Sequence, residues 1–335
     1  MDAIILSGTG GPDVLRLGTA PDPTAGPGQV VVQIRAAAVN HRDVFLRRGI
    51  APSPLPVIIG SDGVGVVREL GAGVSGVAPG DEVVILPSLG WGIDQAAPAP
   101  TFRILGGPDD GTHAELIAVP GENVFPKPAG YSWEEAAALP LAGLTAWRAL
   151  FSRARLLPGE TVLVLGIGGG VATFALHLAH AAGARVIVTS SSDEKLARAA
   201  RMGAQGGVNY RNEADWPRAV RELTGGRGVD VVVDSIGSTW AQSVASLAPG
   251  GRLVAFGGTG GAPDALALRA VTFGQVSLLG TTMGSPADFA ELLAAAAVHP
   301  WRPVIDSVRP LAETAAAHAR IDAGENFGKL VLSVR

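Results

Sequence analysis

The sequence predicts an α/β protein of two domains, one antiparallel and barrel-like and one built on a doubly wound parallel sheet. Three observations favour this class. The chain has 335 residues with 47% hydrophobic side chains, which is large for a single core. Its first third consists of short β-like runs separated by Gly and Pro. After about residue 125, apolar runs alternate with helix-length amphipathic segments.

The first domain is predicted to span residues 1–125, and the tail, residues 299–335, is predicted to rejoin it because it returns to short strands. The expected strands include QVVVQIRAAAV, GVGVVREL, DEVVILP and HAELIAV. The Pro- and Gly-rich segment 87–111 lacks periodicity, and so long a loop inside a compact domain is usually a lid or a binding loop. We therefore expect Trp91 and Arg103 to border a substrate.

The second domain is predicted to span residues 126–298. Ser132 begins an alanine-rich helix as its N-cap, with Glu134 and Glu135 in the first turn. The runs TVLVLG, ARVIVTS and VDVVVDSIG are apolar at nearly every position and are separated by helical segments. This pattern is typical of a parallel sheet covered on both faces.

Composition excludes several classes of site and partner. The chain contains no cysteine, so disulfides, thiolate nucleophiles and cysteine-based zinc or iron–sulfur sites are excluded. The net charge is -4 and no basic stripe is present, so we expect no nucleic-acid partner. The longest apolar run is short and broken by glycines, and the N-terminus lacks a basic leader. We therefore expect a cytoplasmic protein that does not bind membranes.

A glycine cluster at Gly166–Gly170 lies between an apolar strand and an alanine-rich helix. Glycines at this place allow a sharp turn, allow the backbone to approach a pyrophosphate, and direct N–H groups at it from the helix N-terminus. The match to GxGxxG is imperfect, and a turn that binds no ligand is the alternative. The residues predicted to bind the cofactor here are Gly168, Gly169, Gly170 and Val171.

The next strand ends in Thr189, Ser190 and Ser191, where an NAD enzyme would carry an acidic residue. Without a carboxylate to repel it, a 2'-phosphate is accepted, and the hydroxyls of Ser190 and Ser191 can bind it together with Lys195. These residues favour NADP(H). The alternative is a capping box made by Ser191 and Glu194, with Lys195 as a solvated helix residue.

Three further segments resemble the medium-chain dehydrogenase/reductase superfamily. They are LPVIIGSDGVGVVRELGAGVSGVAPGDEVV at residues 55–84, LPLAGLTAWRALF at 139–151 and ENFGKLVL at 325–332. With the glycine turn, these motifs follow the superfamily's order over essentially the whole chain. The resemblance implies a GroES-like catalytic domain, residues 1–125 and 299–335, and a Rossmann NADP(H)-binding domain, residues 126–298.

Within that superfamily the sequence departs from the zinc enzymes. Asn40 stands where they carry a catalytic cysteine, and Ser61 where they carry a histidine. A residual metal site made of His41, Asp62 and His113 lacks the family's geometry. The chain instead resembles the zinc-free branch of quinone oxidoreductases and alkenal or enoyl reductases, so we expect no metal.

The resemblance assigns roles to further residues. It implies that Asn40 and Thr145 lie at the nicotinamide and act as the catalytic residues. It implies that Lys195 and Tyr210 bind the 2'-phosphate and that Asn326 helps to hold the cofactor phosphates. It also places Gly257 and Thr282, which follow two later strands, among the cofactor-binding residues.

The function expected from these residues is metal-free, NADPH-dependent hydride transfer to quinones or α,β-unsaturated carbonyls. Without a metal, the developing oxyanion must be stabilised by hydrogen-bond donors, and the Asn40 amide is the first candidate. A loop cap is its alternative role. Arg42 is interpreted as part of a surface ion cluster. Two alternative functions are an alcohol dehydrogenase acting on alcohols or ketones, and an NADPH-binding protein with little turnover.

The segment VSLLGTTMG provides the expected subunit contact. In the superfamily the corresponding strand commonly pairs across a two-fold axis, and the edge at residues 280–283 would allow a sheet to continue between subunits. The resemblance therefore implies a homodimer.

Overall fold

The computed structural model describes residues 1–261, 265–299 and 301–334. These residues form two compact units. One contains Met1–Leu144 and Ser285–Arg335, and the other contains Thr145–Gly284. The first unit is discontinuous because the chain returns to it after completing the second.

Antiparallel pairing dominates the first unit. Its main sheet has the order β10-β6-β5-β3-β18-β17, with β9 also paired to β3. A smaller sheet has the order β2-β1-β4, and β7 pairs with β8. The strands are β1 (Asp2–Leu6), β2 (Leu15–Thr19), β3 (Gln29–Val39), β4 (Val57–Ile58), β5 (Asp62–Leu70), β6 (Glu82–Ile85), β7 (Ser88–Leu89), β8 (Arg103–Ile104), β9 (Leu116–Pro120), β10 (Val124–Pro126), β17 (Ile305–Pro310) and β18 (Lys329–Ser333).

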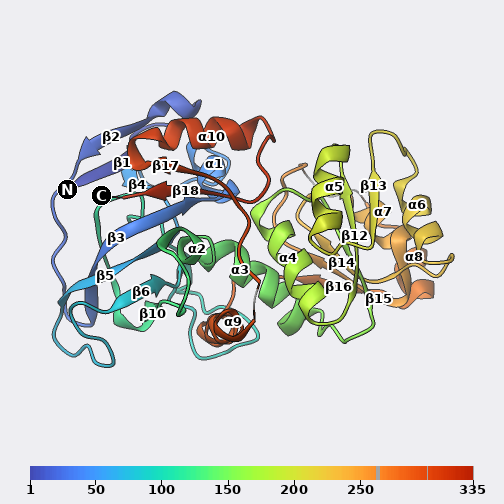
Figure 1. Cartoon of the computed structure of the whole chain (residues 1–335), viewed down its shortest axis with the longest axis horizontal. Helices are drawn as coiled ribbons and strands as arrows, with labels where there is room; N and C mark the ends of the chain where they lie inside the picture. Colours follow the sequence, from blue (N-terminus) through green and yellow to red (C-terminus); the bar gives the residue numbers. More distant parts are fainter. Residues whose placement is uncertain (262–264, 300, 335) are drawn as a thin grey trace. The chain divides into compact units, whose positions relative to one another are not determined.

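Short helices cover this unit's sheets. In Figure 1, α10 lies along β17 and β18. The helices are α1 (His41–Arg47), α2 (Trp133–Ala137), α3 (Pro140–Trp147), which reaches into the second unit, α9 (Pro286–Val298) and α10 (Thr314–Asp322). A core of buried aliphatic side chains, including Ile4, Val32 and Leu332, lies beneath them. β3 and β5 contain runs of consecutive buried residues, and these runs explain why the two strands could be predicted from their apolar sequences.

The boundaries between the units differ from the predicted ones. We expected divisions at residues 125 and 299, whereas the contacts place residues 126–144 and 285–298 with the barrel unit. The reason is packing: α2 contacts β3 and β5, and Phe289 of α9 packs edge-on against Phe125, with ring centroids 5.1 Å apart. Ser132 caps α2 as expected, since its side chain accepts a hydrogen bond from the Glu135 N–H.

The second unit is built on a parallel sheet with the order β13-β12-β11-β14-β15-β16. This order, in which the chain crosses over after β13 to the other side of β11, is that of a doubly wound Rossmann fold. The predicted α/β class with a GroES-like unit and a Rossmann unit is confirmed. The strands are β11 (Thr161–Val164), β12 (Arg185–Ser190), β13 (Gly206–Asn209), β14 (Val229–Asp234), β15 (Leu247–Ala255) and β16 (Ser277–Gly280).

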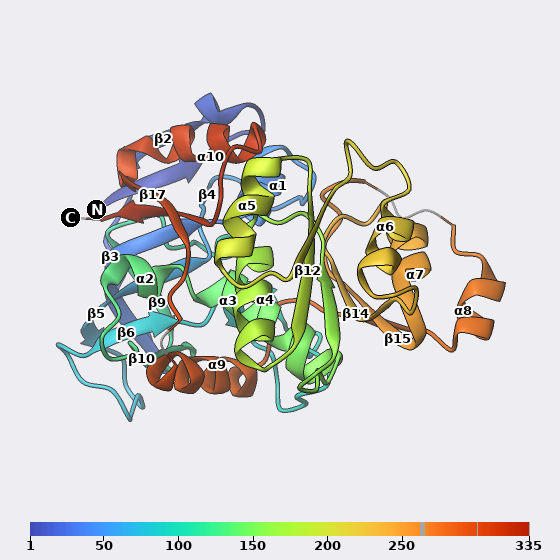
Figure 2. The same cartoon turned by 45° about the vertical axis from the view of Figure 1, so that its right-hand side comes forward.

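Helices lie on the faces of this sheet, with α4 and α5 close together in Figure 2 and α8 at the outer end of the unit. The helices are α4 (Gly170–Ala181), α5 (Asp193–Arg201), α6 (Trp216–Leu223), α7 (Trp240–Ser246) and α8 (Leu268–Gly274). Valines and leucines of β11, β12 and β14 are fully buried, which is the burial that an all-apolar strand requires. Across residues 1–261, 265–299 and 301–334, no helix is long and apolar enough to cross a membrane.

Candidate active site

Asn40 lies at the point where β3 ends and α1 begins. Its backbone is extended, with φ -126° and ψ 157°, and it occupies the N-cap position of α1. The carboxylate of Asp43 accepts a hydrogen bond of 2.8 Å from the Asn40 backbone N–H. This contact is one half of a capping box, in which the Asn40 side chain also faces the Asp43 backbone N–H, so the alternative cap role of Asn40 applies as well. Asn40 is only 5% exposed.

The Asn40 side chain belongs to a buried network with Lys329 and Asp62. The Lys329 ammonium donates to Oδ1 of Asn40 at 2.5 Å, to Oδ2 of Asp62 at 2.8 Å and to the Val39 carbonyl oxygen at 3.0 Å. Asn40 Nδ2 donates to Oδ2 of Asp62 at 2.9 Å. Lys329 is 2% exposed and Asp62 is fully buried, so their opposite charges compensate each other away from water.

Sequence reasoning missed Lys329. It stands three residues after Asn326, at the start of β18, and the antiparallel register places the next residue, Leu330, opposite Val39. That register brings Lys329 beside Asn40 although 289 positions separate them in the sequence. The sequence signal was a lysine directly before the apolar run LVL, because a lysine that is buried with such a strand almost always has a charged partner.

Asp62 has its hydrogen-bonding capacity filled by protein groups. Besides the two bonds to Oδ2, its Oδ1 accepts from the Leu141 N–H at 2.7 Å. The Thr112 hydroxyl donates to the Asp62 carbonyl oxygen at 2.7 Å. Asp62 therefore has a structural role at this site, and it is not arranged as an acid or a base.

The residues at the former metal-ligand positions do not fit a zinc ion. The Ser61 hydroxyl donates to the Leu105 carbonyl oxygen at 2.7 Å, and the Asn40 oxygen accepts from an ammonium. An amide, a hydroxyl and a buried cation are poor surroundings for Zn²⁺, which prefers thiolate, imidazole and carboxylate ligands. Within the described residues, His41, Asp62 and His113 are not grouped as metal ligands.

Arg42 does not belong to a surface ion cluster, so that interpretation is wrong. Its guanidinium donates to the carbonyl oxygens of Ile104 and Leu105, both at 3.2 Å, and to that of Gly107. It also contacts the Ser61 hydroxyl at 3.4 Å. The five N–H groups of arginine can satisfy several backbone carbonyls at once, and this explains the half-buried position.

The segment 87–111 is anchored and contains the short β7–β8 pair, whereas we expected an irregular lid. Trp91 is only 2% exposed and packs edge-on against Phe102 at 5.3 Å between centroids. Arg103 pairs with Asp109 at 2.7 Å. Trp91 is therefore a core residue of the loop, and Arg103 makes a local surface ion pair.

The glycine turn follows β11 as predicted. Gly168 has φ +126°, a region that other residues rarely adopt, and Gly169 is the N-cap of α4. A Cβ added to Gly169 would meet no atom within 4 Å. Gly170 and Val171 begin α4, so the four predicted residues surround one helix N-terminus next to open space, which suits a phosphate group.

The end of β12 carries hydroxyl side chains, and Thr189 supports the glycine turn. Its Oγ1 accepts from the Gly166 N–H at 3.2 Å, and its carbonyl oxygen accepts from the Ile167 N–H at 2.8 Å. Ser191 is half-buried beyond it. The predicted Ser191–Glu194 capping box is wrong: Ser192 caps α5 by accepting from the Lys195 N–H at 3.3 Å. Ser191 was one of three consecutive serines, and the sequence did not distinguish them.

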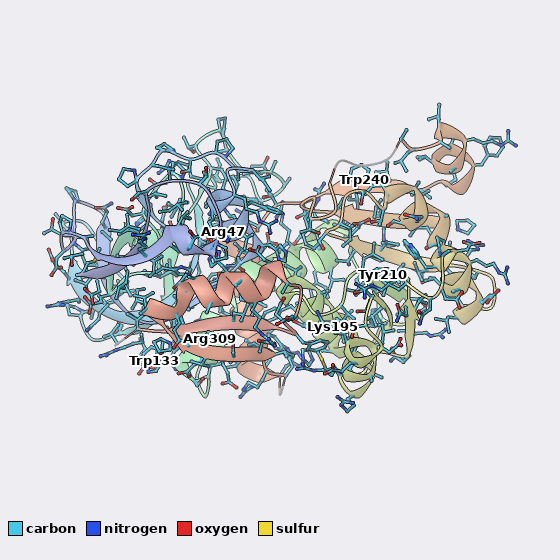
Figure 3. All side chains as sticks on the ribbon, turned by 90° about the horizontal axis from the view of Figure 1, so that it is seen from above. Arg47, Trp133, Lys195, Tyr210, Trp240 and Arg309 are labelled. Atoms are coloured by element: carbon cyan, nitrogen blue, oxygen red, sulfur yellow. The ribbon has the colours of Figure 1, made fainter. Side chains whose placement is uncertain are left out.

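Tyr210 and Lys195 both belong to this unit and are labelled in Figure 3. The Tyr210 N–H donates to the Ser190 carbonyl oxygen at 3.1 Å, and Tyr210 is 43% exposed. Lys195 lies in the first turn of α5, tied to the same strand end through Ser192. The structure thus brings Ser190, Lys195 and Tyr210 together around the carboxyl end of β12, where an adenosine ribose binds in Rossmann folds.

Gly257 and Thr282 lie near a hollow at the carboxyl ends of β15 and β16. Gly257 has φ +78° and lines a cavity of about 290 Å³ together with Trp240, Leu278 and Thr281. Thr282 follows Thr281 and is exposed. The carboxyl ends of adjacent parallel strands are where ligands bind in open α/β sheets.

The two remaining predicted residues are buried. Thr145 is 3% exposed and lies in α3. Asn326 is 8% exposed, and its Nδ2 donates to the Gly328 carbonyl oxygen at 3.2 Å. Asn326 belongs to the barrel unit and Thr145 is the first residue of the Rossmann unit. Their contacts with a cofactor stay predictions.

Burial shifts three pKa values near Asn40. It raises the pKa of the Asp43 carboxyl to about 6, against the lowering effect of Arg42. It lowers the pKa of His113 to about 4 and that of His318 well below its ordinary value. Neither ring nitrogen of either histidine has a hydrogen-bond partner among the described residues. Both histidines are therefore neutral core residues at physiological pH.

Comparison with known proteins agrees with this architecture. A family model described as an alcohol dehydrogenase GroES-like domain matches residues 26–129, and one described as a zinc-binding dehydrogenase matches residues 170–297. A zinc-type alcohol dehydrogenase-like protein of Schizosaccharomyces pombe is 36% identical over 318 residues, covering 92% of this chain and 91% of the relative. A quinone oxidoreductase of Pseudomonas aeruginosa is 34% identical over 334 residues, covering 96% of each.

Solved structures match over the full length as well. One described as an NAD-dependent alcohol dehydrogenase has a TM-score of 0.94 and 41% identity, covering 100% of both chains. A mycobacterial protein complexed with NADPH has a TM-score of 0.86 and 32% identity, again covering 100% of both. A GroES-like unit joined to a Rossmann unit with a glycine turn after its first strand defines a class of two-domain, pyridine-nucleotide-dependent oxidoreductases. The chain belongs to the medium-chain dehydrogenase/reductase superfamily.

Proposed function

We propose that this protein is a metal-free, NADPH-dependent reductase of quinones or α,β-unsaturated carbonyls. The observation that carries the proposal is the network of Asn40, Asp62 and Lys329, in which an amide and an ammonium stand at the former metal position. Bound NADPH would supply the hydride. Polar hydrogen-bond donors then remain to stabilise the charge that develops on the substrate oxygen.

Asn40 is the proposed donor to that oxygen. One hydrogen of its Nδ2 is bound to Asp62, and the other has no acceptor in the described part of the chain. A single neutral amide is a weak electrophile compared with a divalent metal. It suits quinones and enones, because their reduced oxyanions are stabilised by conjugation, and it suits simple ketones poorly.

Preference for NADPH is proposed from the end of β12. Thr189, Ser190 and Ser191 place hydroxyls where an NAD enzyme has a carboxylate, and Lys195 supplies a positive charge. The first acid after the strand in sequence, Asp193, accepts a hydrogen bond of 2.7 Å from the Asn209 side chain. The relatives divide on this point: one structure is described as NAD-dependent and another as an NADPH complex.

Alcohol dehydrogenation is the second candidate function, since several of the similar proteins, including two of those named above, carry alcohol dehydrogenase names. This reaction would require a group other than a zinc ion to activate the alcohol, because the Lys329 ammonium lies beside Asn40. A metal-dependent oxidation of alcohols by the purified protein would favour this candidate.

A homodimer is part of the proposal. β16 lies at an edge of the parallel sheet as far as the structure describes it, and Leu278 on this strand is 42% exposed. Leu268 and Phe273 of the neighbouring α8 are each 75% exposed. An exposed apolar strand edge suits pairing with a second copy. Light scattering of the wild type and of Leu278→Lys tests this: we expect a dimer that the substitution dissociates, and a monomeric wild type would contradict it.

The decisive experiment has two parts. Titration with NADPH and NADH, followed by nicotinamide fluorescence in the wild type and Lys195→Ala, should show a preference for NADPH that the substitution abolishes. NADPH oxidation with 1,4-benzoquinone and with an enone should then proceed unchanged after dialysis against a chelator. Binding of NADPH without turnover on either acceptor would favour a binding protein with little catalytic activity. Loss of turnover on chelation would contradict the metal-free mechanism.

A further inference from the structure

We propose that Lys329 is the positioning residue that fixes which way the Asn40 amide faces, and that the reaction depends on it. This inference rests on the proposed function, since Asn40 is the donor to the substrate oxygen there. The ammonium itself has no N–H left to donate to a substrate oxygen. Its three hydrogens are used by Val39, Asn40 and Asp62.

The argument begins with the symmetry of an amide side chain. A rotation of the Asn40 side-chain amide by about 180° exchanges Oδ1 and Nδ2 with little change of shape, so packing alone does not choose between the two orientations. In the observed orientation Oδ1 faces the Lys329 donor and Nδ2 faces the Asp62 acceptor. In the rotated one, the amide N–H groups would face an ammonium and the amide oxygen a carboxylate. Both contacts would be repulsive, so the charged pair selects one orientation.

The selected orientation has a chemical consequence. With Oδ1 bound to Lys329 and one Nδ2 hydrogen bound to Asp62, the group that Asn40 has left is an N–H donor. The rotated amide would use its donors differently and could turn a lone pair toward a developing oxyanion, which is repulsive. Donors aimed in advance at the place where charge develops account for much of oxyanion stabilisation, so a loss of orientation should reduce kcat.

Asp62 is held in place by groups other than Lys329. Asp62 has three further anchors, since Oδ1 accepts from the Leu141 N–H, its carbonyl oxygen accepts from Thr112, and its strand is paired on both sides. It stays in place when Lys329 is lost. Asp62 and Lys329 both touch Asn40 directly, Asp62 at Nδ2 and Lys329 at Oδ1, so the amide is held at two points. The loss of Lys329 leaves the single bond from Nδ2 to Asp62, about which the amide can swing.

The test compares Lys329→Met with a matched control, Arg47→Met. Arg47 is also a fully buried cation of the same unit, paired with Asp322 at 2.6 Å, and the structure gives it no bond to Asn40. Both variants lose a buried positive charge, so both should be less stable. Asp62 loses its cation in Lys329→Met, whereas Asp322 keeps Arg48, at 2.8 Å, in Arg47→Met. Lys329→Met should lower kcat with benzoquinone about 10- to 100-fold, a range typical of a misplaced catalytic group. The dissociation constant of Lys329→Met for NADPH should change less than about twofold. Arg47→Met should keep a near-wild-type kcat at a temperature where both variants are folded.

A double variant, Asp62→Asn with Lys329→Met, removes both charges and guards against misfolding of the single variant. It should recover stability, because no uncompensated charge remains, and it should stay low in kcat. Recovery of kcat in the double variant would overturn the proposal. So would an equal loss of kcat in Lys329→Met and Arg47→Met, which would indicate a purely structural effect.

A spectroscopic measurement separates this inference from the proposed function. In ¹⁵N-labelled protein, the Nδ2 resonances of Asn40, assigned with Asn40→Ala, should move in Lys329→Met and stay in Arg47→Met. If the wild type reduces neither quinones nor enones but the resonances behave in this way, the proposed function fails while the orienting role of Lys329 holds. If the resonances do not move in Lys329→Met, the orienting role is wrong whatever the activity.

Discussion

Thr189 and Gly166 are joined by a hydrogen bond of 3.2 Å, from the glycine backbone N–H to the threonine Oγ1. The bond connects the end of β12, where the adenosine ribose is expected, to the turn that is expected to hold the phosphates. One side chain thus supports two parts of the proposed cofactor site. The contribution of Thr189 to cofactor binding can be measured separately from that of residues expected to touch the 2'-phosphate.

Thr189→Val should weaken the binding of both cofactors. Valine keeps the shape and removes the acceptor, so the turn loses a hydrogen bond worth about 1 kcal/mol. We expect the dissociation constants for NADPH and NADH to rise together, about threefold to tenfold, with their ratio unchanged. Fluorescence titration measures both constants. A change in the ratio would show instead that Thr189 contacts the 2'-phosphate.

Ser191→Asp should move cofactor preference toward NADH. A carboxylate at this half-buried position would repel the 2'-phosphate and could accept hydrogen bonds from a ribose. We expect NADPH affinity to fall about 10-fold or more, as expected for one unfavourable charge pair in a partly desolvated site. Ser191→Asn has the same shape without the charge and should retain the preference for NADPH. Equal behaviour of the two variants would remove Ser191 from the proposed site.

The stability of the protein should fall in mild acid because of His113. Its pKa is about 4 in the folded chain against an ordinary value of 6.5, so the unfolded state binds the proton more readily. The stability linked to neutral His113 is fully present when the pH is above the ordinary histidine pKa. It is lost as the pH falls from about 6.5 to about 4. Full loss amounts to something on the order of 3 kcal/mol. His318 acts in the same direction, whereas Asp43, whose pKa is raised to about 6, opposes it.

Urea denaturation at about pH 8 and about pH 5 measures this effect through the free energy of unfolding. His113→Gln should be less stable than the wild type at the higher pH, and its loss of stability between the two values should be smaller. His299, outside the buried cluster, provides the control as His299→Gln. A slope in His113→Gln as steep as that of the wild type would assign the acid sensitivity to other groups.

Arg42→Met should loosen the segment 87–111. The substitution leaves the carbonyl oxygens of Ile104, Leu105 and Gly107 without their guanidinium donor. We expect a loss of stability of about 1 to 3 kcal/mol and faster proteolysis within this segment. Arg103→Met is the matched control, because its surface pair with Asp109 is worth about 1 kcal/mol at most. Similar proteolysis patterns in the two variants would contradict the anchoring role of Arg42.

Several elements could be predicted because their determinants are local. The largely apolar strands β11, β12 and β14, the glycine turn before α4 and the Ser132 cap each depend on a few consecutive residues. Lys329 could not be placed beside Asn40, because their contact depends on a strand register set by the whole barrel unit. Arg42 was misinterpreted since its partners are backbone carbonyls, which residue types do not reveal. The unit boundaries differed because α2 and α9 pack on the barrel, and tertiary packing decides such assignments.

Trp91 packs edge-on against Phe102 within the loop 87–111 and helps to hold the conformation of that loop. Aromatic contact, the Arg42 bonds to backbone carbonyls and the Trp91 indole N–H bond to the Asp94 carbonyl oxygen at 2.9 Å hold this segment, and it contains no thiol. Neither oxidants that attack cysteine nor scarcity of trace metals acts on contacts of this kind. The segment should therefore keep its conformation in the presence of oxidants that attack thiols and of metal chelators.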